Sequence, residues 1–62
     1  MQTKTEYQIL IVDDDQDLRE NLVEILTSES YITTTARTAK EAFEHLKSKA
    51  FDVILLDFMM PE

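Results

Sequence analysis

The sequence predicts an α/β protein, in which a parallel β-sheet is flanked by helices. Three short apolar runs, rich in β-branched residues, alternate along the chain with two segments of helical periodicity. Such alternation is typical of parallel strands joined by right-handed helical crossovers. The 62 residues suffice for one small domain, so we expect a single βαβαβ unit over residues 1–62.

The first strand is expected at Gln8–Val12, which contains no polar side chain after Gln8. A run of this kind suits a strand that is buried on both faces. Acidic residues follow it, and a helix should begin among them. The residues expected on the apolar face of that helix recur at helical spacing and are Leu18, Leu22, Ile25 and Leu26, whereas polar residues such as Arg19 fall mostly elsewhere.

The second strand is expected at residues 31–36, where four residues are β-branched but three of them are threonines. This composition predicts a less buried strand at an edge of the sheet. Thr38 and Glu41 then match a capping box, which predicts the start of the second helix. His45 falls off the apolar stripe of that helix and is expected to face solvent; the stripe consists of Ala39, Ala42, Phe43 and Leu46.

The third strand is expected at residues 52–56, and its apolar side chains predict burial on both faces. Pro61 should end any regular pairing after it. The strand is followed at once by a carboxylate, Asp57, which needs an explanation of its own.

Acidic side chains follow two of the predicted strands. Asp13 and Asp14 come after the first strand, and Asp57 comes after the third. Because parallel strands end at one edge of their sheet, these carboxylates should converge if the two strands are neighbours. Carboxylate oxygens without nearby His or Cys suit Mg²⁺, or alternatively Mn²⁺. The sequence therefore predicts a divalent cation site at this edge.

The acidic run, residues 13–17, has two other interpretations. It can be a solvated helix start, in which aspartates cap exposed amides. It also resembles a calcium loop, with carboxylates at the first, third and fifth positions and Glu24 at the twelfth. Leu18 stands where that loop requires glycine, and a strand precedes the run, so the calcium loop is rejected.

Composition excludes several classes of function. Thirteen acidic residues against six basic ones give a net charge of −7, which argues against binding to nucleic acid or to an anionic membrane. The chain has no glycine, which excludes glycine-dependent phosphate loops. It has no cysteine for disulfides and no apolar stretch of membrane-spanning length, so we expect a cytoplasmic protein.

The segments ILIVDDDQDLRE and DVILLDFMMP together resemble the receiver domain of two-component response regulators, over residues 8–61. The resemblance implies a flavodoxin-like sheet with strand order 2-1-3 and a phospho-acceptor, Asp57, that takes a phosphoryl group from a histidine kinase. It implies Mg²⁺ bound directly by Asp14, with Asp13 assisting, and by the backbone carbonyl of Met59. A phospho-acceptor of this kind is not an enzyme acting on a separate substrate.

The chain also departs from the family pattern. Receiver domains have five strands, and the absent part carries a hydroxyl residue and a lysine that sense the phosphoryl group. We therefore expect the N-terminal half of a receiver domain, without the switch. The alternative is an inactive structural half-domain. In either case the third strand would leave an exposed edge, which predicts a homo-oligomer, most simply a two-fold dimer joined through residues 52–56 or by exchanged elements.

Overall fold

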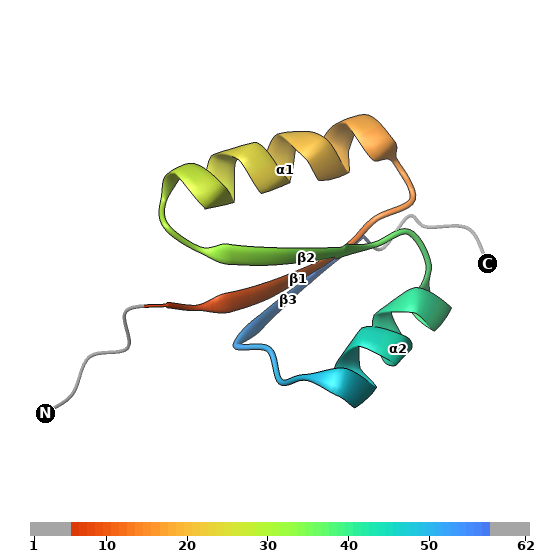
Figure 1. The fold of residues 1–62 in the computed structure, drawn as a ribbon. Coiled ribbons are helices and arrows are strands. Elements are labelled where there is room, and N and C mark those ends of the chain that lie inside the picture. The colour runs from red at the N-terminus through yellow and green to blue at the C-terminus, as the bar shows by residue number, and fades with distance from the viewer. Residues whose placement is uncertain (1–5, 58–62) are drawn as a thin grey trace, which may run out of the picture.

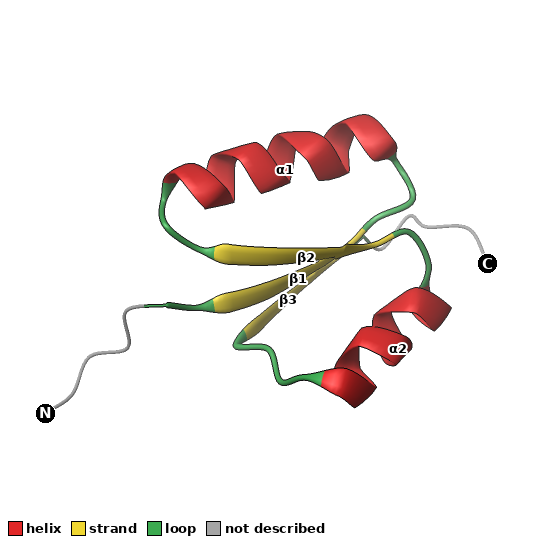
Figure 2. Ribbon diagram, in the orientation of Figure 1, coloured by secondary structure: helices red, strands yellow, loops and turns green. Residues whose placement is uncertain are grey.

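A computed structural model describes residues 6–57 as one three-stranded parallel sheet with two helices (Figure 1, Figure 2). The strand order is β2-β1-β3, which confirms the predicted α/β class and the order 2-1-3. The predictions for Met59 and Pro61 lie outside the described residues. The elements are β1 (Gln8–Val12), α1 (Gln16–Ser28), β2 (Ile32–Ala36), α2 (Ala39–Ser48) and β3 (Val53–Leu56).

The register of the sheet brings the carboxyl ends of its strands level. Val12, the last residue of the central strand β1, pairs with Ala36 on one side and Leu56 on the other. Two further backbone bonds continue the ladder: Asp13 donates its N–H to the carbonyl of Ala36 at 3.0 Å, and Asp57 donates to Val12 at 3.1 Å. The residues that follow β1 and β3 are therefore held side by side.

The core is centred on β1, as its sequence predicted. Leu10, Ile11 and Val12 are each less than 2% exposed. The helices α1 and α2 lie on opposite faces of the sheet (Figure 1). Leu10 and Val12 pack with Ala36 and Ala42 on the α2 side, while Ile11 faces the α1 side, because successive side chains of a strand point to opposite faces.

The buried face of α1 differs from the predicted stripe. Leu18 and Ile25 are 44% and 58% exposed, and the set of residues that faces the sheet keeps only the other two members of the predicted stripe and adds two more. That set is half-buried and consists of Arg19, Leu22, Val23 and Leu26. The physical reason is that α1 packs on β1 and β2 but makes no comparable contact with β3, so the side of its stripe nearest β3 stays uncovered.

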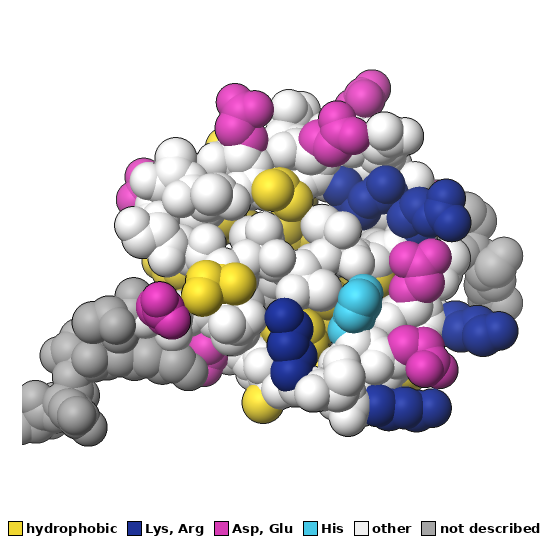
Figure 3. Space-filling view, in the orientation of Figure 1, with side chains coloured by type: hydrophobic (Ala, Val, Ile, Leu, Met, Phe, Trp, Pro, Cys, Tyr) yellow, Lys and Arg dark blue, Asp and Glu magenta, His cyan; other side chains and the backbone are white. Residues whose placement is uncertain are grey.

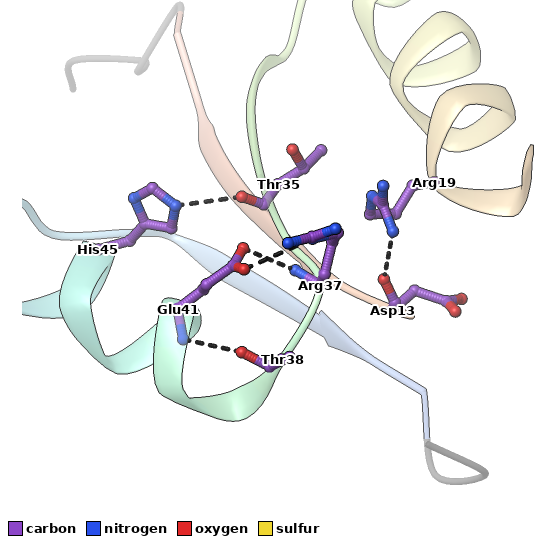
Figure 4. Close-up of polar contacts among 7 residues, drawn as sticks. All are labelled: Asp13, Arg19, Thr35, Arg37, Thr38, Glu41 and His45. Atoms are coloured by element: carbon purple, nitrogen blue, oxygen red, sulfur yellow. Dashed lines mark hydrogen bonds and ion pairs between the residues drawn. The ribbon is translucent and has the colours of Figure 1, made fainter. Parts of the chain in front are cut away.

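The face of α2 is also shifted from the prediction. Phe43 is 63% exposed and Leu46 is 38% exposed, while Ala42 is buried against the sheet. His45, expected in solvent, is half-buried, and its Nε2 lies 3.1 Å from the backbone oxygen of Thr35 (Figure 4). The helix thus meets β2 through small and polar side chains.

The prediction that the third strand is buried on both faces is wrong for the described residues. β3 lies at an edge of the sheet and pairs only with β1 there. Its four apolar side chains, on both faces, are between 37% and 53% exposed. The apolar composition was recognised correctly, but among residues 6–57 no element covers this strand. Neither described helix is long and apolar enough to cross a membrane.

Candidate functional site

Three carboxylates meet at the carboxyl edge of the sheet. One oxygen from each of Asp13, Asp14 and Asp57 lies within 4.8 Å of the others. Asp13 is buried, Asp14 is exposed and Asp57 is half-buried. The structure therefore brings together the three acidic residues that the sequence placed at one edge, because β1 and β3 are neighbours and end level.

Asp13 is the most buried of the three and is held by hydrogen bonds on two sides. Its side chain is 3% exposed, and its Oδ1 accepts a 2.9 Å hydrogen bond from the backbone N–H of Asp15. Its own N–H is bonded to Ala36, so Asp13 is tied to the sheet and to the loop that follows. A carboxylate can accept several hydrogen bonds or metal contacts at once, and the bond to Asp15 leaves capacity for a ligand.

Asp15 has a different role from its acidic neighbours. It is the N-cap of α1, and its Oδ1 accepts a hydrogen bond of 3.2 Å from the N–H of Leu18. Capping by aspartate satisfies an amide that has no partner within the helix. The helix-start interpretation therefore holds for Asp15, whereas Asp13 and Asp14 belong to the carboxylate cluster with Asp57.

Arg19 is a residue of this region that sequence reasoning missed. Its Nη1 donates a 2.9 Å hydrogen bond to the backbone carbonyl of Asp13, whose carboxylate points away from this contact (Figure 4). The prediction left Arg19 off the apolar face of its helix. The spacing of six residues from Asp13 is compatible with such a contact, but only the loop geometry reveals it.

An apolar hollow of about 220 Å³ opens beside the carboxylates, between α1 and β3. Asp13 and Asp57 stand at its polar end. Its other lining residues are Ile11, Val12, Leu18, Leu22, Leu55 and Leu56. Apolar walls lower the local dielectric constant, so a cation held by the carboxylates would interact with them more strongly than in open water.

The donor set fits a hard divalent cation. The cluster offers carboxylate oxygens only, and these are the ligands that Mg²⁺ and Mn²⁺ prefer. Mg²⁺ commonly keeps several waters and takes only one or two carboxylates from a protein, so three carboxylates are sufficient. Met59, whose backbone carbonyl was expected to contribute, lies outside the described residues.

A second polar cluster, on α2 and the loop before it, has a structural role. Glu41 accepts a 3.1 Å hydrogen bond from the N–H of Arg37 and donates its own N–H to the side chain of Thr38 (Figure 4). The bond from Arg37 lowers the pKa of Glu41. Acidic side chains line the upper rim of this face, over α1, while charges of both signs mix beside α2 (Figure 3), and local ion pairs such as Lys47–Glu44 account for part of that mixture.

Comparison with protein families gives one match, to the model described as the response regulator receiver domain, over residues 9–62. No solved structure matches the chain. The matched segment includes the three clustered carboxylates and the five described elements, apart from Gln8 at the start of β1.

Several curated relatives are similar over nearly the whole chain. A probable transcriptional regulator, ycf27, of Cyanidium caldarium is 38% identical over 98% of this chain and 24% of its own length. An uncharacterized 14.6 kDa protein of Leptolyngbya boryana is 42% identical over all of this chain and 47% of its own length. The response regulator receiver protein CpdR of Brucella abortus is 36% identical over 89% of this chain and 46% of its own length. The chain thus spans half or less of these relatives.

Proposed function

Because this chain belongs to the response regulator receiver domain family, we propose that it accepts a phosphoryl group on Asp57 from a histidine kinase. The observation that carries the proposal is the cluster of Asp57 with Asp13 and Asp14 at the carboxyl edge of the sheet. A half-buried carboxylate at a strand end, beside two others, has the position that a nucleophile with its own cation site requires.

The proposed reaction is a phosphoryl transfer between two side chains. An oxygen of Asp57 attacks the phosphorus of a phosphohistidine; the new O–P bond forms as the N–P bond breaks, and the released imidazole takes up a proton. Asp57 is suited to the attack because its N–H is bonded to Val12, which fixes the backbone from which the carboxylate extends. Positioning of this kind is a main source of catalysis in phosphoryl transfer.

Asp13 and Asp14 would hold Mg²⁺ or Mn²⁺ next to the acceptor, together with Asp57. When bound, the cation offsets the repulsion between the anionic carboxylate and the anionic phosphoryl group. The chain's own contribution is to keep three carboxylates converged, with Asp13 anchored from two sides. Phosphorylated Asp57 would carry added negative charge, the usual means by which a phosphoryl group biases a protein surface.

The test is labelling with acetyl phosphate, a small donor, in the presence of MgCl₂. Intact-mass spectrometry should show the gain of one phosphoryl group, and hydroxylamine should remove it, because an acyl phosphate is labile to that reagent. The gain should be absent in Asp57→Asn and present in Asp52→Asn, which alters the carboxylate at the other end of the same strand segment. Unlabelled wild-type protein, or labelling that persists in Asp57→Asn, would contradict the proposal.

The exposed edge of β3 supports a second proposal, that two copies of the chain associate through this strand. Four consecutive apolar residues, Val53–Leu56, are exposed on both faces at an edge of the sheet. Edges of this composition pair readily with another strand, and a second copy brings an identical apolar strand. This association would also suit the alternative function, a structural half-domain without phosphoryl transfer.

Light scattering after size-exclusion chromatography tests the association. We expect a dimer at micromolar concentration that dissociates in Ile54→Lys, because a charge at the edge opposes strand pairing. Ile25→Lys is the matched control, since Ile25 is 58% exposed on α1 and takes no part in the edge of β3. A monodisperse wild-type monomer would refute this proposal and leave the phospho-acceptor proposal untouched.

A further inference from the structure

We propose that Arg19 is a positioning residue for the cation site. Its guanidinium fixes the peptide plane between Asp13 and Asp14, and thereby holds the two carboxylates in the arrangement that binds a divalent cation. This inference rests on the proposed function, because it concerns the same three carboxylates. It assigns a role to a basic residue that lies outside the carboxylate cluster.

The main chain of Asp13 is held on both sides. Its N–H donates to Ala36 at 3.0 Å, and its carbonyl accepts from Nη1 of Arg19 at 2.9 Å. A peptide unit is planar, so the carbonyl of Asp13 and the N–H of Asp14 turn together. Fixing that carbonyl therefore fixes the whole peptide plane. The two ends of this plane are the Cα atoms of Asp13 and Asp14, which carry the carboxylate side chains. Figure 4 shows that Arg19 meets the backbone and that the Asp13 carboxylate points away from it.

Hydrogen bonds close residues 13–19 into a ring. Asp15 donates its N–H to the carboxylate of Asp13 and caps α1, and the N–H of Arg19 donates to the carbonyl of Asp15 at 3.0 Å. The guanidinium of Arg19, on the helix, completes the ring by donating to the carbonyl of Asp13. Arg19 is half-buried over the sheet, in a hollow that it forms with Glu20, Val23 and Thr35. The ring is thus anchored to the first turn of a helix.

Repulsion among the clustered carboxylates is what the hydrogen bond from Arg19 opposes. Three like charges within 4.8 Å repel one another, and Asp14, the exposed one, is the most able to move away. A charge-assisted hydrogen bond in a partly buried place is stronger than one between neutral groups. Arg19 can therefore hold the loop in its cation-binding shape before the cation arrives, which lowers the cost of binding.

Positioning and simple electrostatics predict opposite results when Arg19 is changed. The guanidinium is a positive charge near the site, so Coulomb repulsion alone would make cation binding tighter once it is removed. Positioning predicts weaker binding, because the loop carrying Asp13 and Asp14 loses its anchor. The sign of the change therefore separates the two explanations.

The experiment compares Mg²⁺ binding by calorimetry in wild type, Arg19→Met and Arg19→Lys. We expect about tenfold weaker binding in Arg19→Met, a loss typical of groups that orient metal ligands. Arg19→Lys, which keeps a charged donor, should recover part of the affinity. Arg37→Met is the matched control and should match wild type, because Arg37 pairs with Glu41 at the surface. Unchanged or tighter binding in Arg19→Met would overturn the inference.

A measurement without metal separates this inference from the proposed function. Hydrogen exchange in EDTA follows the N–H of Asp15, which is bonded to the Asp13 carboxylate. This amide should exchange faster in Arg19→Met than in wild type, while the amides of β1 keep their protection and show that the variant is folded. Equal protection at Asp15 in both proteins would refute the positioning role. Absence of Mg²⁺ binding by wild type would refute the proposed function instead.

Discussion

Asp13→Asn should make the metal-free chain more stable and the Mg²⁺-bound chain less stable. The Coulomb repulsion between two carboxylates 4.8 Å apart is about 1 kcal/mol in water and about 3 kcal/mol at an effective dielectric constant of about 20. The substitution removes two such pairs and keeps an oxygen that accepts from Asp15. The weaker, neutral hydrogen bond costs about 1 kcal/mol. Because Asp14 is exposed and Asp57 is half-buried, the aqueous figure applies, and the net stabilisation is about 1 kcal/mol.

Urea unfolding at low ionic strength measures both effects. In EDTA the midpoint of Asp13→Asn should exceed that of wild type by about 1 M, given a slope of about 1 kcal/mol per M for a small domain. Mg²⁺ at about 100 times its dissociation constant adds about 2.7 kcal/mol to wild type and little to the variant, so the order should reverse. Glu24→Gln, which removes an exposed charge from α1, is the control: Mg²⁺ should not reverse the order of its stability relative to wild type. This reasoning would be refuted if Asp13→Asn were less stable than wild type in EDTA, or more stable than wild type in Mg²⁺.

Three further predictions concern the fold. Leu10→Ala, at a side chain that is fully buried, should cost about 3 kcal/mol of unfolding free energy, whereas Ile25→Ala at the surface should cost less than about 1 kcal/mol; equal costs would contradict the assigned core. Ser30 has a left-handed φ of 73°, so Ser30→Gly should stabilise the chain by about 0.5 kcal/mol in thermal unfolding, and destabilisation would refute it. The hydrogen bond from the Arg37 N–H lowers the pKa of Glu41 below its ordinary value of 4.5. The stability it adds is therefore present above that value and is lost as the pH falls through the lower folded pKa; Glu41→Gln should remove that part of the acid dependence, and an unchanged pH profile would count against it.

Sequence reasoning succeeded where one local pattern determines the structure. The unbroken apolar run of β1 predicted a fully buried strand, and Leu10, Ile11 and Val12 are buried. Thr38 was expected to cap the second helix, and it accepts from the N–H of Glu41. Strand order also follows from the family pattern. From that order, the meeting of acidic residues after β1 and β3 is a consequence of parallel geometry.

It failed where the answer depends on which neighbour covers a surface. The apolar stripe of α1 is real in the sequence, but Leu18 and Ile25 stay exposed because α1 packs over β1 and β2. The apolar residues of β3 suggested burial, yet among residues 6–57 only β1 lies beside that strand. His45 and Arg19 both turn toward backbone carbonyls, and contacts of this kind leave no periodic signal in a sequence.

The central claim is that the three carboxylates form one divalent cation site. Amide spectra of isotope-labelled protein, recorded during a Mg²⁺ titration, test it most directly. We predict dispersed peaks whose shifts are concentrated at Asp13, Asp14 and Asp57 and at the residues bonded to them, and these shifts should be lost in Asp57→Asn. A spectrum that Mg²⁺ does not change, or shifts spread evenly over the acidic residues of the surface, would contradict the account.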